Sequence, residues 1–110
     1  MGAEAFIELQ ISWERRMSIS SSTIIKTQKA SGYLQQLCKH FSHKTEVKFD
    51  AQAGWIEFAF GRAELRADEN VLTLVANSQN PDSLDNLKKV LASHLERFAF
   101  REDLKIKWEN

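Results

Sequence analysis

The segment 30–43 has the hydrophobic spacing of an amphipathic helix. Its apolar residues recur at i, i+3, i+4 and i+7, the spacing that places side chains on one helical face. They are Leu34, Leu37, Cys38 and Phe41. We expect this face to pack against a core.

A second helix is predicted over residues 81–101. Asn80 is a good N-cap, Pro81 suits the first helical position, and Asp82 complements the helix dipole. The apolar stripe of this helix consists of Leu84, Leu87, Leu91, Leu95 and Phe98. We expect the stripe to cover the same core as the first helix.

The chain between the helices alternates apolar and polar residues, as in antiparallel strands. A two-residue turn at 61–62, with glycine in its first position, places Phe58 opposite Leu65. A turn through 68–70 then places Leu65 opposite Leu74. The two turns agree on which face of the sheet is apolar.

Two further segments complete the predicted sheet. A four-residue turn at 51–54 places Phe49 opposite Ile56, and residues 104–108 alternate like a last strand. The side chains predicted to face solvent are Glu46, Lys48, Glu57, Arg62, Glu64, Arg66 and Thr73.

With an opening strand around 23–26, the element order is β-α-β-β-β-β-α-β. This order predicts an α+β fold, with a curved antiparallel sheet and two helices on one face. The arrangement resembles that of the TATA-binding protein, which is an analogy of architecture and implies no DNA binding.

The chain is expected to form a single α+β domain over residues 17–110. Residues 1–16 are interpreted as an N-terminal extension, because a second methionine, Met17, and a serine-rich run follow them. Their alternating apolar residues leave an additional edge strand as the alternative. Neither alternative changes the predicted helix stripes or the register of the sheet.

Composition excludes several classes of partner. Fifteen basic and fifteen acidic residues cancel, so the chain has no overall attraction to nucleic acid or to an anionic membrane. No apolar run is long enough to span a bilayer, and the N-terminus lacks the features of a signal peptide. The single cysteine, Cys38, fits a reducing compartment, so we predict a cytoplasmic protein.

From Met17 onward, the chain resembles a bacterial family of unknown function, family 2218. The matching segments are residues 33–44, 56–61, 63–67 and 94–102. Members of that family are often encoded near siderophore-interacting or iron-uptake proteins, and some are fused to them. The resemblance therefore implies a link to iron metabolism, but it brings no established activity and no known functional residues.

The candidate ligand-binding residues come from the two helices. His40 lies on the flank of the first apolar stripe beside Tyr33, and His94 lies within the second stripe with Arg97 and Arg101 on its flank. One interpretation is structural: His94 satisfies its ring nitrogens on a backbone carbonyl or on Tyr33. The other is functional: His40 and His94 converge as ligands or as a proton-transfer pair.

Other patterns near these residues are less specific. The sequence Cys38-x-His40-x-x-His43 suggests a metal site, but a helix points Cys38 away from His40, and Cys38 fits the core. The like charges of Arg97 and Arg101 repel each other, and either Glu102, a sheet carboxylate or an anionic ligand offsets that repulsion. No catalytic motif is recognisable, and no particular cofactor or metal is implied.

Three functions remain open on the sequence alone. The first is a non-enzymatic binding or accessory module for a small anionic or metal-linked ligand. The second is an enzyme that uses His40 or His94 as acid/base and Arg97 or Arg101 as an anion site. The third is an interaction or homodimerisation domain that docks a partner through exposed aromatic residues and the charged face of the sheet.

Overall fold

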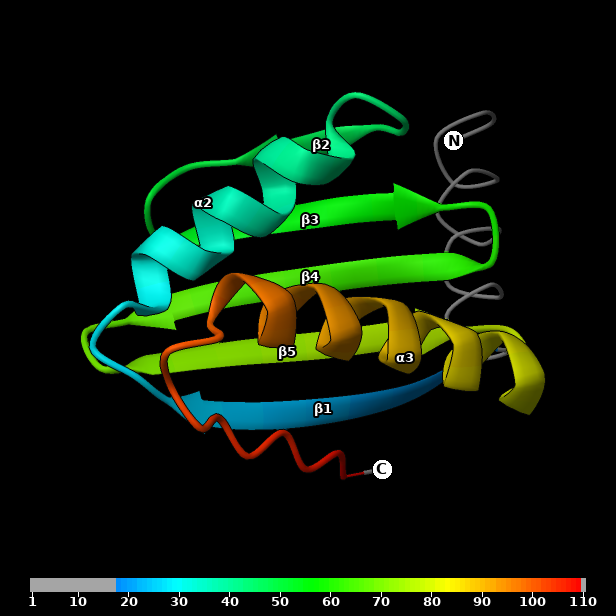
Figure 1. Ribbon diagram of the computed structural model, residues 1–110. Helices are drawn as coiled ribbons and strands as arrows, with labels where there is room; N and C mark the ends of the chain where they lie inside the picture. The colour runs from blue at the N-terminus through cyan, green and yellow to red at the C-terminus, as the bar shows by residue number, and fades with distance from the viewer. Residues whose placement is uncertain (1–17, 110) are drawn as a thin grey trace, which may run out of the picture.

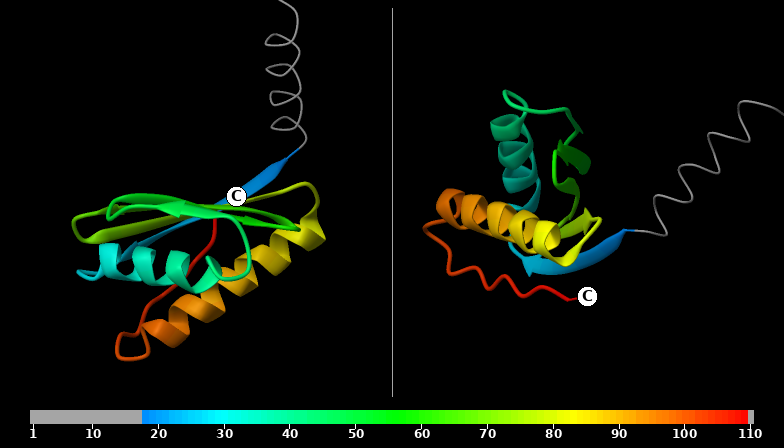
Figure 2. Two further views of the ribbon diagram at one scale, coloured as in Figure 1. Left: turned by 90° about the horizontal axis from the view of Figure 1, so that it is seen from above. Right: turned by 90° about the vertical axis from the view of Figure 1, so that its right-hand side faces the viewer.

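The computed structural model describes residues 18–109, which form one antiparallel sheet and two helices (Figure 1). The strands lie in the order β1-β5-β4-β3-β2, and both helices cover the same face of the sheet (Figure 2). The predicted α+β class is therefore confirmed. The predicted extension 1–16 lies outside the described residues. The elements are β1 (Ile19–Lys26), α2 (Ala30–Phe41), β2 (Val47–Phe49), β3 (Ala53–Phe58), β4 (Gly61–Asp68), β5 (Val71–Ser78) and α3 (Pro81–Phe98).

Both predicted apolar stripes face the core. All four stripe residues of α2 are buried, as are four of the five in α3, while Phe98 is only partly buried and packs against the core. The cap of α3 is also as predicted, because the Ser83 amide donates to Asn80 Oδ1 at 2.9 Å. Neither helix within residues 18–109 combines the length and hydrophobicity needed to cross a membrane.

Each helix ends a few residues before its predicted limit. Helix α2 ends at Phe41, whose carbonyl accepts hydrogen bonds from the amides of Lys44 and Thr45 in a closing turn. Helix α3 ends at Phe98, and the Glu102 amide then donates to the Ala99 carbonyl as the chain turns away. In both cases, backbone hydrogen bonds of a turn replace the next helical ones.

The strand faces are as predicted, but two of the registers are not. Leu65 pairs with Leu74 as expected. Ile56, however, pairs with Val47 on one side and with Ala63 on the other. The turn between β3 and β4 consists of residues 59–60. Relative to the predicted registers, both pairings are therefore shifted by an even number of residues. An even slip keeps each side chain on its predicted face.

The predicted trailing strand at 104–108 is wrong. This segment lies beside β1 (Figure 1) but joins it at one bridge only, where Ser22 and Glu109 exchange two backbone hydrogen bonds of 2.7 Å. Leu104, Ile106 and Trp108 nevertheless pack against the core. The alternation of apolar and polar residues in 104–108 reflects this burial of one side of the segment. Such burial does not require the segment to form strand hydrogen bonds. The observed order is therefore β-α-β-β-β-β-α.

Candidate functional site

Two of the predicted ligand-binding residues, His40 and His94, lie side by side where α2 and α3 pack together. Their ring centroids are 4.8 Å apart and the rings are tilted by 50°. His40 lies near the end of α2 and is exposed, whereas His94 lies in the second half of α3 and is half-buried. The pair is therefore accessible from solvent on the helical side of the molecule.

Phenylalanine rings surround the two imidazoles. The Phe41 ring lies 4.9 Å from that of His94 and 5.0 Å from that of Phe58, and the Phe98 ring lies 5.8 Å from that of His40. Phe41 belongs to the buried stripe of α2, so this wall continues the core. The packing holds the imidazoles in place and shields one side of each from water.

The hydrogen bond of His94 identifies the protonated ring nitrogen. His94 Nδ1 lies 2.7 Å from the carbonyl oxygen of Val90. A carbonyl oxygen only accepts, so Nδ1 carries the hydrogen and donates it. In the neutral ring, Nε2 then carries a lone pair. This is the structural interpretation for one nitrogen of His94, and it leaves the other available to a ligand.

Basic groups surround His40. Burial against its neighbours lowers the pKa of the His40 imidazole, and His94, Lys44, Arg97 and His43 lower it further in that order. No carboxylate is among the groups that shift this pKa. None of the ion pairs among residues 18–109 includes Lys44 or Arg97. We call His40, His94, Arg97 and Lys44 the basic cluster.

Tyr33, another predicted site residue, lies in a different network. Its hydroxyl donates a short hydrogen bond to Glu102 Oε2, and Thr27 Oγ1 donates to Glu102 Oε1 at 2.9 Å. Burial and the Glu102 carboxylate raise the pKa of Tyr33 to about 12. The hydrogen bond from Tyr33 lowers the pKa of Glu102. This network fastens the start of the C-terminal segment to α2 and to the end of β1.

Arg101 is also separate from the basic cluster. Its guanidinium lies 5.4 Å from the centroid of the Phe100 ring. Glu102, which we considered as the partner of Arg97 and Arg101, instead accepts from Tyr33 and Thr27. Within residues 18–109, neither arginine has an ion-pair partner. Because α3 ends at Phe98, Arg101 lies beyond the helix, and the two arginines do not form the helical i, i+4 pair that the sequence predicted.

The network around Glu102 predicts a pH-dependent stability. Tyr33→Phe removes the hydroxyl that stabilises the Glu102 carboxylate, so we expect a lower melting temperature at neutral pH. Because the pKa of Glu102 is lowered by folding, its contribution is present above the ordinary pKa of 4.5. It is lost as the pH falls through the lowered value. Thermal unfolding of parent and variant between about pH 3 and pH 7 measures the difference.

Glu102→Gln is the control for that experiment. It removes the titrating group but keeps a side chain of similar size, so parent and variant should converge at acidic pH. A melting difference between parent and Tyr33→Phe that is equally large at both ends of the pH range would contradict this role of Glu102.

The structure places Cys38 in the core, as expected for a small hydrophobic residue. Burial raises the pKa of its thiol to about 12, so the thiolate is not formed at neutral pH. Its sulfur also lies under β3, where a β-carbon on Gly54 would come 3.1 Å from Cys38 Sγ and 2.7 Å from Phe49 Cβ. Cys38 therefore does not take part in a surface site, and His40 and His43 lack a cysteine partner.

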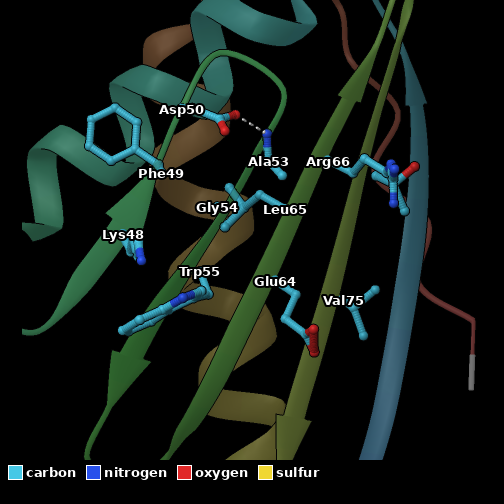
Figure 3. A pocket seen from close by; sticks show the side chains of 11 residues that line it. Lys48, Phe49, Asp50, Ala53, Gly54, Trp55, Glu64, Leu65, Arg66 and Val75 are labelled. Atoms are coloured by element: carbon cyan, nitrogen blue, oxygen red, sulfur yellow. Dashed lines mark hydrogen bonds between the residues drawn. The ribbon is translucent and has the colours of Figure 1, made fainter.

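A hollow on the open face of the sheet was not anticipated from the sequence (Figure 3). Its volume is about 610 Å³, and it lies over the strand row that joins Lys48, Trp55, Glu64 and Val75. Ala53, which lies on the same face of β3 as Trp55, is among the residues that line it. The signal in the sequence is Trp55, an aromatic residue that alternation places on the same face as Lys48 and Glu64.

The charges around this hollow are largely satisfied by the sheet surface itself. Asp50 accepts from the amides of its own turn at 2.8 and 2.9 Å. Arg66 lies 3.6 Å from Asp68, and the Arg62 guanidinium lies 4.4 Å from the centroid of the Trp55 ring. Such pairing is typical of a solvated face. In contrast, Lys44 and Arg97 of the basic cluster take part in none of the ion pairs within residues 18–109.

Comparison with known proteins shows the family. Residues 22–109 match the DUF2218 family, described as an uncharacterised protein conserved in bacteria. The chain belongs to this family. The matched range contains His40, Lys44, His94 and Arg97, and thus all residues of the basic cluster. The resemblance inferred from the sequence is confirmed.

A solved protein of similar structure supports the same fold. The NMR structure of PA4090 from Pseudomonas aeruginosa superposes with a TM-score of 0.71 at 37% sequence identity, over 82% of this chain and 94% of that chain. A search of curated proteins finds no match. The family description names no ligand or reaction, so the chemistry of the basic cluster has to suggest the function.

Proposed function

We propose that the protein is a non-enzymatic binding or accessory module that holds a small anion, such as a carboxylate or a phosphate, at the basic cluster. The observation that carries the proposal is the set of groups around His40: His94, Lys44 and Arg97 are all basic, and no carboxylate acts on it. Uncompensated positive charge of this kind attracts anions.

The individual side chains suit this task. The planar guanidinium of Arg97 can donate paired hydrogen bonds to a carboxylate or phosphate, and Lys44 adds a compact positive charge. His94 Nδ1 is held by Val90, which orients the ring before a ligand arrives. The rings of Phe41 and Phe98 supply an apolar boundary that strengthens nearby charge interactions.

The alternatives from the sequence remain predictions. No observation on the structure favours catalysis by His40 or His94. The link to iron metabolism implied by the family resemblance, the cytoplasmic location and a homodimer likewise stay predictions. The exposed side chains of Ile24 and Phe100, at 68% and 75%, are the apolar residues that an interaction domain would use.

Calorimetric titration tests the proposal. We expect saturable binding of at least one anion in a panel of phosphate, sulfate, acetate and citrate. Arg97→Ala should weaken that binding by about tenfold or more, because a hydrogen bond to a charged group contributes about 1.5–3 kcal/mol. The melting temperature should hardly change, because an exposed arginine contributes little to folding.

Arg66→Ala is the matched control. It removes an arginine that is paired with Asp68 and lies on the open face of the sheet, opposite the face that the helices cover. Binding should survive this change. If the parent binds no anion in the panel, the interaction-domain alternative gains. If binding is unchanged in Arg97→Ala, Arg97 does not belong to the site.

A further inference from the structure

The two imidazoles of the basic cluster are suited to a metal ion. Imidazole nitrogen is a good ligand for zinc, copper, nickel and iron. A metal-binding histidine usually donates its other ring hydrogen to a carbonyl or carboxylate, which fixes the tautomer. His94 makes this bond to Val90, so its Nε2 lone pair is free. His40 brings a second imidazole, from a different helix, with its ring centroid 4.8 Å from that of His94.

The protein alone does not complete a coordination sphere. Within residues 18–109, no group of three or more histidine, cysteine, aspartate or glutamate side chains is placed to hold a metal ion. A structural zinc site has four protein ligands and a catalytic one has three. An ion held by His40 and His94 therefore needs ligands from another molecule.

The charges around the pair restrict which molecule that is. Arg97 lies one helical turn after His94 in α3, and Lys44 lies four residues after His40, just beyond the end of α2, so both place positive charge near the pair and repel a bare divalent cation. The same two side chains attract a metal ion whose chelator gives the complex a net negative charge. Anionic chelators bind through carboxylate or similar oxygen groups, which are also the groups that arginine and lysine recognise.

We propose that the ligand of the basic cluster is an anionic chelate of a transition metal, in which His40 and His94 take the coordination positions that the chelator leaves open. Arg97 and Lys44 hold the oxygen groups of the chelator. This inference rests on the proposed anion-binding function, because it assigns both halves of one ligand to the same cluster.

Nickel(II) nitrilotriacetate is a suitable probe, because the complex is anionic and keeps adjacent positions open for imidazole. The full chain, prepared without an affinity tag, is titrated with the complex, with nitrilotriacetate alone and with nickel chloride alone. We expect the complex to bind more tightly than either component. His94→Ala and His40→Gln should each weaken binding of the complex by about tenfold or more. Removing a group that only supports a metal ligand already costs about tenfold or more in affinity, so removing the ligand itself should cost at least as much. Since His40 is exposed, His40→Gln leaves the core intact.

His43→Ala is the matched control, because His43 is an exposed histidine on the same chain turn but makes none of the ring contacts described for His40 and His94. Binding of the complex should survive it. Loss of binding in His43→Ala, with retention in His94→Ala, would assign the metal to the His40 and His43 pair and overturn the inference. Paramagnetic broadening of NMR signals near the bound nickel locates the site independently.

The component titrations separate this inference from the function on which it rests. If nitrilotriacetate alone binds as tightly as its nickel complex and Arg97→Ala abolishes both, the anion site stands and the metal inference fails. If the complex binds through the histidines but Arg97→Ala has no effect, the role of Arg97 fails, and the inference in this form fails with it. If neither the complex nor any anion binds, both proposals fail.

Discussion

Gly61→Ala is expected to destabilise the protein strongly. Gly61 opens β4 with a φ of 156°, and a β-carbon there would overlap the Asn77 carbonyl and the Ser78 hydroxyl of β5. It would also lie 3.0 Å from Leu87 Cδ2 on α3. Because backbone atoms on the neighbouring strand cannot move aside cheaply, the combined cost of backbone strain and overpacking is roughly 2–6 kcal/mol. Chemical denaturation measures this change in the free energy of unfolding.

Gly32→Ala is the same substitution in the opposite environment. Gly32 lies in α2, and a β-carbon there would have nothing within 4 Å. Alanine stabilises a helix relative to glycine by roughly 0.5–1 kcal/mol, because an unfolded chain with alanine has fewer backbone conformations and so loses less entropy when it folds. The two variants should therefore shift stability in opposite directions. Equal and small effects at both positions would show that β4 and β5 do not approach each other as closely as described at Gly61.

Leu91→Ala is expected to be the second large effect, with a loss of about 2–5 kcal/mol. The Leu91 side chain is fully buried in the stripe of α3 between Leu87 and Leu95, and this helix packs on β5, β1, β4 and α2. Truncation leaves a cavity that the surrounding sheet cannot fill without moving several elements. The midpoint and slope of urea unfolding determine the loss of free energy.

Lys89→Ala on the exposed side of the same helix is the control for helix propensity. It should change the free energy of unfolding by less than about 0.5 kcal/mol. A comparable cost at both positions would mean that α3 is rotated relative to the orientation described. A rotated α3 would also move His94 away from His40, so this pair of variants tests the geometry of the basic cluster as well as the core.

Local patterns were sufficient for much of the fold. The helix stripes and the Asn80 cap were predictable because helical spacing and capping involve residues close together in the chain. The faces of the strands were predictable for the same reason, since alternation has a period of two. The pairing of Leu65 with Leu74 followed from a short turn whose length leaves few registers open.

The registers of the other strand pairs depended on long-range packing. The glycine at position 61 suggested a turn, but its small size is used inside β4 for the close approach to β5. Residues 59–60 form the turn instead. A glycine signals that a side chain is not tolerated, and the sequence does not say whether a turn or a neighbouring strand is the cause.

The candidate site shows the same division. Helical projection placed His40 beside the first apolar stripe and His94 within the second, and the packing of α2 on α3 brings the two rings together. It also placed Tyr33 and Arg101 near them, yet Tyr33 donates to Glu102 and Arg101 lies over Phe100. Spacing along one helix tells which face a side chain occupies, but it does not tell which residue of another element lies opposite.

The sequence by itself determined the class of fold, the buried and exposed faces of its helices and strands, and the family. These properties follow from periodicity and from short-range capping and turn preferences, which act within a few residues. Only the tertiary structure decided that residues 104–108 pack without joining the sheet, and that His40 of α2 lies against His94 of α3. Both outcomes depend on contacts between residues far apart in the chain, where burial, backbone hydrogen bonding and charge compete for the same space.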